Sequence, residues 1–210
     1  YCQLQDLLSL LYTHQIEIII EATRMLGATG YHSVTTKALS KKIGIAEMIL
    51  YRCFKNKDAI VLACILDTGN KQMENWHKIV ATEIDPLEAL FHIAADFSYN
   101  PSSESVGFQL LQRLCAEQLE PSLSDAIASI YTQFCNFLEE HLNRIISYHR
   151  LNEQKQEKVR HLAWVLVHWG SGLGQMQFLP IDEAHTEEFK SQQISLAMNF
   201  IKDHLWCTPQ

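Results

Sequence analysis

The sequence predicts an all-α protein in which a small helix-turn-helix domain is joined by a long helix to a larger helical domain. Apolar residues recur at helical spacing along most of the 210 residues, and an apolar content of 47% is enough to bury a full core. Pro86 and Pro121 stand where first helical turns are expected. Residues 33–60 divide into two short amphipathic segments around one glycine. We therefore expect one domain at residues 1–62 and a second at residues 63–210.

The chain opens with a leucine-rich segment. Leucines at positions 4, 7, 8, 10 and 11 share one face of a helix over residues 1–14. This segment has no Lys or Arg, so contact with a membrane surface is disfavoured. We expect an extra turn or two of helix that packs on the domain or on a neighbour.

Residues 33–60 predict two helices at helix-turn-helix spacing. Thr35 and Thr36 carry hydroxyls of the kind that cap a helix, and Gly44 supplies the left-handed turn at the end. The second helix is expected at about residues 46–53. The inward positions are Ala38, Leu39, Ile43, Ile49 and Leu50, and the outward positions on the second helix are Glu47, Met48, Tyr51 and Arg52. Helical hairpins also occur in proteins that contact no nucleic acid, so the hairpin alone leaves both interpretations open.

The charge of the chain is unevenly distributed. Residues 31–60 hold six Lys or Arg and two acidic residues, a net charge of +4, whereas the whole chain carries −7 and the remaining segments therefore −11. A basic face on an acidic body is expected of a protein that touches DNA at one end, because neutralising phosphates supplies affinity for any sequence. The alternative interpretation is a solvated helix face.

Apolar and turn residues at fixed spacings extend this pattern upstream and downstream. Its positions are Ile18, Ile19, Ala22, Met25 and Leu26, then Gly30-Tyr31, Thr35-Thr36, Gly44-Ile45, Leu50-Tyr51, Phe54, Asn56-Lys57-Asp58 and Ile60. Over about residues 15–62 the chain resembles the N-terminal domain of the TetR family of bacterial transcriptional regulators. The resemblance implies a homodimer whose two recognition helices enter successive major grooves of a double-stranded operator. It also implies an all-helical regulatory domain whose last two long helices pair with their copies in a four-helix bundle.

The recognition helix departs from that family. Where the family usually has a small hydroxyl residue, this chain has Ala46-Glu47-Met48-Ile49, so a capping hydroxyl is missing. Cys53 replaces the family's usual imidazole or aromatic residue. Glu47 brings negative charge towards the phosphate backbone unless it accepts a hydrogen bond from a cytosine amino group.

Eight residues are predicted to contact DNA. The resemblance implies phosphate contacts for Thr36, Tyr51 and Lys57. Lys37, Lys41 and Arg52 are added on charge. Glu47 and Met48 are the outer side chains near the start of the recognition helix, and we expect them to contact bases, Met48 through a thymine methyl group.

The pattern of the rest of the chain predicts long amphipathic helices. Periodicity predicts helices at about residues 58–82, from Pro86 to a loop at 100–103, and at about 106–118, 121–148, 153–178 and 187–205. Aromatic residues of this part are expected mostly in the core, with some lining a cavity for an apolar or amphipathic small molecule. The candidates are Trp76, Phe91, Phe97, Phe108, Tyr131, Phe134, Trp164 and His168. Candidates for the dimer interface are Leu166, Gly170, Leu173, Ile194, Met198 and Ile201.

Several function classes lack a sequence signal. There is no phosphate-cradling glycine loop, no Cys/His cluster at metal-ligand spacing and no nucleophile motif, so we expect neither enzyme activity nor a metal or cofactor. No apolar run approaches the roughly 18 to 20 residues of a membrane span. The six cysteines have no paired close spacing, which favours the reducing cytoplasm.

Two hypotheses of function therefore compete. The first is a ligand-responsive homodimeric regulator, acting as a repressor, that binds a palindromic operator and is released by a small molecule. The second is a TetR-like helical dimer with lost or altered DNA binding that serves as a small-molecule sensor or a protein-interaction module. The departures at residues 46–49 are the reason to keep the second.

Overall fold

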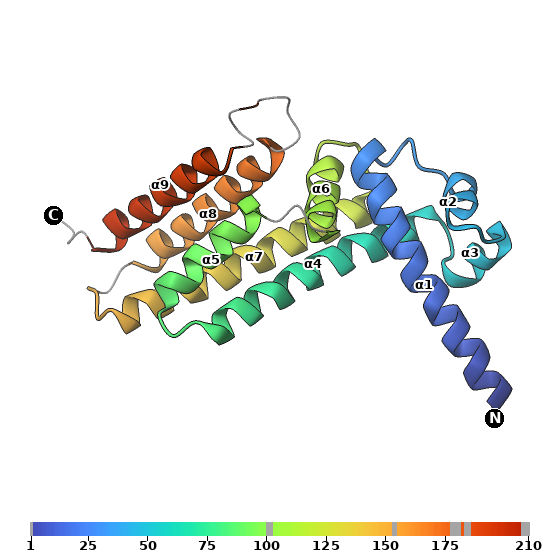
Figure 1. Cartoon of the computed structure of the whole chain (residues 1–210), viewed down its shortest axis with the longest axis horizontal. Coiled ribbons are helices and arrows are strands. Elements are labelled where there is room, and N and C mark those ends of the chain that lie inside the picture. The colour runs from blue at the N-terminus through green and yellow to red at the C-terminus, as the bar shows by residue number, and fades with distance from the viewer. Residues whose placement is uncertain (1, 100–102, 153–154, 177–181, 183–185, 207–210) are drawn as a thin grey trace. The chain divides into compact units, whose positions relative to one another are not determined.

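The computed structural model describes residues 2–99, 103–152, 155–176, 182 and 186–206. Within these residues the chain is built from α-helices without a strand, so the predicted all-α fold is confirmed (Figure 1). The helices are α1 (Cys2–Thr29), α2 (Thr36–Ile43), α3 (Glu47–Cys53), α4 (Lys57–Thr82), α5 (Pro86–Tyr99), α6 (Ser103–Cys115), α7 (Pro121–Tyr148), α8 (Gln156–Met176) and α9 (Glu187–Trp206). The leucine-rich start is the first part of the continuous helix α1.

The helices group into two compact units. Unit 1 consists of Tyr1–Asn70 and Ser103–Ala128, and unit 2 of Lys71–Ser102 and Ser129–Gln210. Helices α4 and α7 contribute residues to both units. The predicted domains divide the chain once, after residue 62, whereas each unit is assembled from two separate segments. The predicted domain boundary stays a prediction.

Unit 1 is organised around α1, which contacts α2, α3 and α6. Ile18, Ala22 and Leu26 recur every four residues and form a fully buried stripe on α1. Each buried side chain of leucine or isoleucine size contributes about 1.5–3 kcal/mol relative to an exposed one. The other buried apolar residues of unit 1 include Val34, Leu39, Leu50, Ile60, Val61, Leu110, Leu111 and Leu114.

Local signals set the ends of the helices in unit 1. Thr35 caps α2, because its side chain accepts a hydrogen bond from the backbone N–H of Ala38 at 3.1 Å. Gly44 ends α2 with φ of +83°, and Gly30 ends α1 with φ of +82°. The predicted start and end of the first hairpin helix are therefore correct. The inward placement of Ala38 is wrong, since this residue is exposed while Leu39 fills the core.

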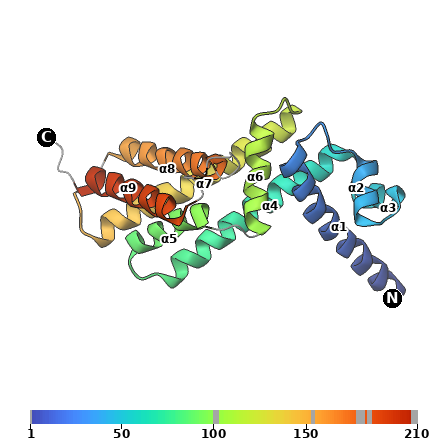
Figure 2. The ribbon, with the colours of Figure 1, turned by 45° about the horizontal axis from the view of Figure 1, so that its top comes forward.

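Unit 2 has an aromatic centre. Trp76 on α4 is fully buried, with its ring centroid 5.0 Å from that of Phe134 and 5.3 Å from that of Phe137, both on α7. Helix α5 contacts α8 and α9, and these last two helices lie side by side in both views (Figures 1 and 2). None of the described helices is both long enough and apolar enough to cross a membrane.

A buried histidine connects α7 to the start of α5. Nε2 of His141 lies 2.7 Å from the carbonyl oxygen of Pro86, and the imidazole stacks on Phe137 at an interplanar angle of 2°. Burial lowers the pKa of His141, against the hydrogen bond to Pro86, which raises it. The folded unit therefore favours the neutral imidazole.

The two left-handed glycines offer a matched pair of substitutions. Alanine at either position should cost about 1–2 kcal/mol of stability, because a Cβ disfavours the left-handed backbone. A Cβ at Gly44 has open space around it, whereas a Cβ at Gly30 would overlap the carboxylate of Glu117. Urea unfolding should therefore show Gly30→Ala to be the more destabilising. Equal costs would contradict a tight Glu117 contact, and in a Glu117→Ala background the costs should become equal.

The buried imidazole predicts a loss of stability in acid. The pKa of His141 is lower in the folded protein than in the unfolded chain, where it is about 6.5. Below about pH 6.5 the unfolded chain thus binds more protons, so this contribution is complete above that pH and is lost as the pH falls towards the folded pKa. The difference in free energy of unfolding between the wild type and His141→Gln should shrink from pH 7 to pH 5. A difference in free energy of unfolding that does not change with pH would contradict the lowered pKa of His141.

Candidate nucleic-acid interface

Helix α3 presents a mixed outer face. Leu50 is fully buried against the core of unit 1, whereas Met48 and Tyr51 are 63% and 50% exposed and Arg52 is also exposed. The helix begins after Ala46, which makes no side-chain capping bond, and its first turn contains the acid Glu47. An acid at this position stabilises the positive end of the helix dipole. The predicted outward positions on α3 thus include the most exposed side chains of the helix.

Three predicted contact residues bind one another across α2 and α3. The hydroxyl of Thr36 donates a hydrogen bond to Oε1 of Glu47 at 2.7 Å. The same hydroxyl lies 3.1 Å from the phenolic oxygen of Tyr51. Thr36 and Tyr51 were predicted to face phosphates and Glu47 to face bases, yet in the free protein the three side chains form one cluster.

Lys57, the first residue of α4, binds Tyr31 in the loop before α2. Its Nζ donates a hydrogen bond to the carbonyl oxygen of Tyr31 at 2.5 Å and lies 3.8 Å from the centroid of the Tyr31 ring. Burial lowers the pKa of Lys57, against the nearby charges of Asp58 and Glu117. A phosphate contact by Lys57 would have to replace these bonds.

Tyr31 is the hub of this second cluster, although the sequence pattern places it only at the end of the first helix and names it in no site. Its hydroxyl donates to the carboxylate of Asp58 at 2.6 Å, and that hydrogen bond, with burial, raises the pKa of Tyr31 to about 12. Its backbone N–H lies 2.9 Å and 3.1 Å from the two carboxylate oxygens of Glu117. Glu117 lies 86 residues away in the sequence, so no local signal could have indicated this contact.

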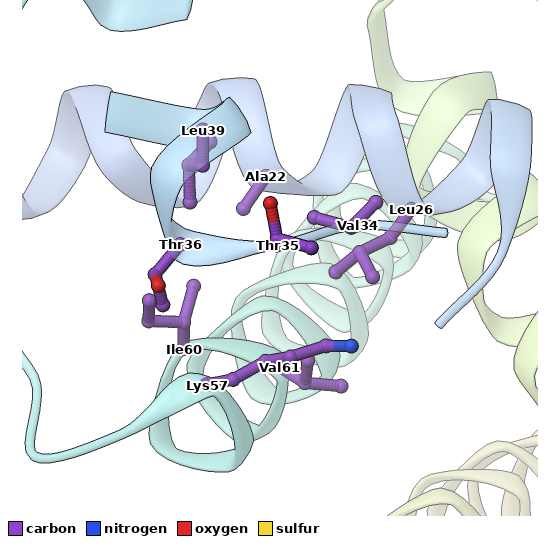
Figure 3. A pocket seen from close by; sticks show the side chains of 9 residues that line it. All are labelled: Ala22, Leu26, Val34, Thr35, Thr36, Leu39, Lys57, Ile60 and Val61. Carbon is purple, nitrogen blue, oxygen red and sulfur yellow. The ribbon is translucent and has the colours of Figure 1, made fainter. Parts of the chain in front are cut away.

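A small pocket is lined in part by Thr36 and Lys57, one residue from each cluster. It has a volume of about 10 Å³, room for about one water molecule, and is lined by Ala22, Leu26, Val34, Thr35, Thr36, Leu39, Lys57, Ile60 and Val61. Figure 3 shows the Lys57 side chain extending along the pocket with its nitrogen directed away from Thr36. The pocket is too small for an organic ligand.

The remaining predicted cations are solvent-facing. Lys37 and Lys41 are exposed on α2, and Arg52 is exposed on α3. Helices α2 and α3 contact each other. The predicted set thus divides into exposed cations on α2 and α3 and polar groups that are engaged within the chain.

The predicted pocket residues occupy different environments. Trp76 and Phe134 are buried in the core of unit 2, Tyr131 and Trp164 are half-buried, and Phe91 and His168 are exposed. The side chains of Phe97 and Phe108 lie outside the described part of the structure. These placements leave the ligand pocket a prediction.

The predicted dimer residues point into their own chain. Leu166, Gly170, Ile194, Met198 and Ile201 are buried and Leu173 is half-buried. The outer faces of α8 and α9 instead expose Val165, Leu196 and Phe200, at 44%, 62% and 40%. An open groove of about 350 Å³ runs between these two helices, lined by Lys155, Glu157, Lys158, His161, Leu162, Val165, Phe200 and His204. Leu196 and Phe200 were not among the candidates named from the sequence, although they are spaced as neighbours on one side of a helix.

No group of three or more His, Cys, Asp or Glu side chains in the described ranges is arranged to hold a metal ion. A search of the curated proteins found no match to this chain. The family model for bacterial regulatory proteins of the tetR family matches residues 18–64.

Solved structures of similar fold cover almost the whole chain. A TetR-family transcriptional regulator from Agrobacterium tumefaciens is 15% identical with a TM-score of 0.76, over 89% of this chain and 98% of that chain. A transcriptional regulator from Saccharomonospora viridis, solved in complex with choline, is 15% identical with a TM-score of 0.73, over 94% and 100%. AibR, solved with isovaleryl coenzyme A and operator DNA, is 15% identical with a TM-score of 0.66, over 89% and 96%.

The family match covers α2 and α3 completely. It also covers the last part of α1, from Ile18 onward, and the start of α4. It coincides with the stretch from which the resemblance was inferred. Residues 18–64 are therefore a TetR-family N-terminal domain, in a chain that has the fold of TetR-family transcriptional regulators.

Proposed function

We propose that this chain is a DNA-binding transcriptional regulator that acts as a homodimeric repressor on a palindromic operator and is released by a small apolar or amphipathic ligand. The observation that carries the proposal is the TetR-family helix-turn-helix, in which α3 turns Met48, Tyr51 and Arg52 outward. A helix of this kind enters the major groove and contacts base edges.

Phosphate contacts and base contacts have separate sources. Lys37, Lys41 and Arg52 are exposed cations that attract any duplex. Met48 is the most exposed apolar side chain on α3 and suits a thymine methyl group. Lys57 joins the phosphate contacts once it exchanges the Tyr31 carbonyl for a phosphate oxygen. We expect modest sequence discrimination because few side chains on α3 can reach bases.

The ligand part of the proposal rests on unit 2. Solved chains of this fold include one with choline and one with isovaleryl coenzyme A. In this chain the aromatic centre around Trp76 and Phe134 would provide apolar walls, with Tyr131 at its edge at 6.0 Å between the Tyr131 and Phe134 ring centroids. The effector is a small molecule with an apolar part.

The dimer part of the proposal rests on the outer faces of α8 and α9. Val165 and Gly172 lie about two turns apart on α8, and a Cβ at Gly172 would meet open space. On α9, Leu196 and Phe200 are one turn apart and exposed. An isologous contact between two copies would cover these apolar side chains.

The sensor hypothesis without DNA binding is supported by a specific observation. The hydroxyl of Thr36 is hydrogen-bonded to Glu47 and to the phenol of Tyr51, and Lys57 is hydrogen-bonded to the carbonyl oxygen of Tyr31. A chain of this kind would still bind a ligand and dimerise while contacting DNA weakly.

The proposed DNA contact predicts a response to one charge. Arg52→Ala should weaken retention of every duplex and reduce the steepness of the salt dependence by about one unit, because one phosphate contact is lost. Lys202→Ala removes the same charge from exposed α9 in unit 2 and should change neither quantity. Fluorescence anisotropy with random and selected duplexes at several salt concentrations measures both. Equal effects of the two variants would contradict the assignment to α3, and no binding by the wild type would favour the sensor hypothesis.

The proposed dimer predicts that charge on the outer α8–α9 face separates the subunits. Val165→Glu and Leu196→Glu should each shift the protein from dimer to monomer at micromolar concentration, since they place a carboxylate in an apolar contact. Ile84→Glu is the control, because Ile84 is 87% exposed in the loop before α5. Light scattering gives the mass of each variant. A monomeric wild type would refute the dimer, and unchanged dimers in both variants would refute this face.

A further inference from the structure

The cluster of Thr36, Glu47 and Tyr51 has a defined direction of proton donation. A carboxylate can only accept hydrogen bonds, so the single proton of the Thr36 hydroxyl points to Glu47 at 2.7 Å. The 3.1 Å contact between Thr36 and Tyr51 must then use the proton of the Tyr51 phenol. The bonds run from Tyr51 to Thr36 to Glu47, so the Tyr51 proton is held by the Thr36 oxygen and the Thr36 proton by the carboxylate.

This arrangement places an anion of the chain itself at the end of a series of two hydroxyl donors. Thr36 is the first residue of α2, whose N-terminus favours negative charge, and Tyr51 stands half-exposed on α3. A DNA phosphate oxygen seeking either hydroxyl finds its proton already used. It also meets the charge of Glu47 at close range, which repels it.

We propose that Glu47 acts as an internal substitute for a DNA phosphate, which withholds the hydroxyls of Thr36 and Tyr51 from the DNA backbone and so sets a low affinity for duplexes of any sequence. The inference rests on the proposed DNA-binding function. Glu47 is thereby a positioning residue that acts on the hydroxyls that would donate hydrogen bonds to a phosphate. This role replaces the contact with bases that the sequence predicts for Glu47. When DNA binds tightly, the Glu47 side chain must turn away and release both donors.

Two substitutions separate the charge of Glu47 from its hydrogen bond. Glu47→Gln removes the charge but keeps an oxygen that can accept from Thr36. Glu47→Ala removes both and frees the two hydroxyls. Affinity for any duplex should therefore increase from the wild type to Glu47→Gln to Glu47→Ala, by roughly tenfold in total, because charge-assisted bonds to phosphate are gained and a like charge is lost.

The gain should depend on the hydroxyls. In a background of Thr36→Val and Tyr51→Phe, Glu47→Ala should lose most of its advantage, since no donor remains to be released. Asp125→Asn removes one negative charge from an exposed position on α7 in the same unit and should give no comparable gain. Circular dichroism and thermal unfolding show whether each variant retains its fold. If Glu47→Ala does not fold, Glu47→Gln alone must still bind more tightly than the wild type.

Anisotropy titrations on a panel of duplexes at low and moderate salt decide between the outcomes. A uniform increase that requires Thr36 and Tyr51 supports the proposal, also when only the variants bind. If the wild type binds and Glu47→Ala merely changes the order of preferred sequences, Glu47 reads bases and this inference is overturned while the proposed function stands. If neither the wild type nor any Glu47 variant retains a duplex, both the inference and the proposed function fail.

Discussion

Unit 1 depends on a single apolar stripe along α1. Ile18, Ala22 and Leu26 are fully buried, and the helix that carries them contacts α2, α3 and α6. Because protein interiors are close-packed and do not deform continuously, one stripe that serves several partners fixes them as a group. The direction in which α3 presents its outer side chains therefore follows from packing on α1. A change in the stripe would disturb the helix-turn-helix and the position of α6 together.

The outer face of the hairpin is governed by a different constraint, the small number of side-chain hydroxyls near the start of α3. Ala46 offers no cap, so Glu47 is the group in the first turn that stabilises the helix dipole. Its bond to Thr36 also ties α3 to α2. The same carboxylate uses the proton of Thr36 and, through it, that of Tyr51. Glu47 thus stabilises the hairpin locally and, by the same contacts, lowers the affinity expected for an anionic partner.

Sequence reasoning succeeded where the signal was local. Thr35 and Gly44 mark the ends of α2 because a capping hydroxyl and a left-handed glycine act within a few residues. It could not place Glu117 against Tyr31, since the two are far apart in the chain. On α9 the sequence pointed to Ile194 and Ile201 for the dimer interface, which stays a prediction; these two residues are buried within the chain, and Leu196 and Phe200 are exposed. Both sides of that helix carry apolar residues, so periodicity does not tell which one faces inward.

The fold and the chemistry of the contact face have different determinants. A helical fold is specified by its buried pattern, here residues such as Leu39 and Leu50, whereas exposed positions such as Met48 and Arg52 are free to change without cost to packing. A chain only 15% identical over most of its length shares this fold, so the likeness alone says little about which duplex α3 would touch. That question belongs to the first turn of α3. There Ala46 stands at the capping position and the acid Glu47 follows it. In the proposed mechanism, Glu47 and a phosphate compete for the same hydroxyl donors, and this competition sets the affinity for DNA.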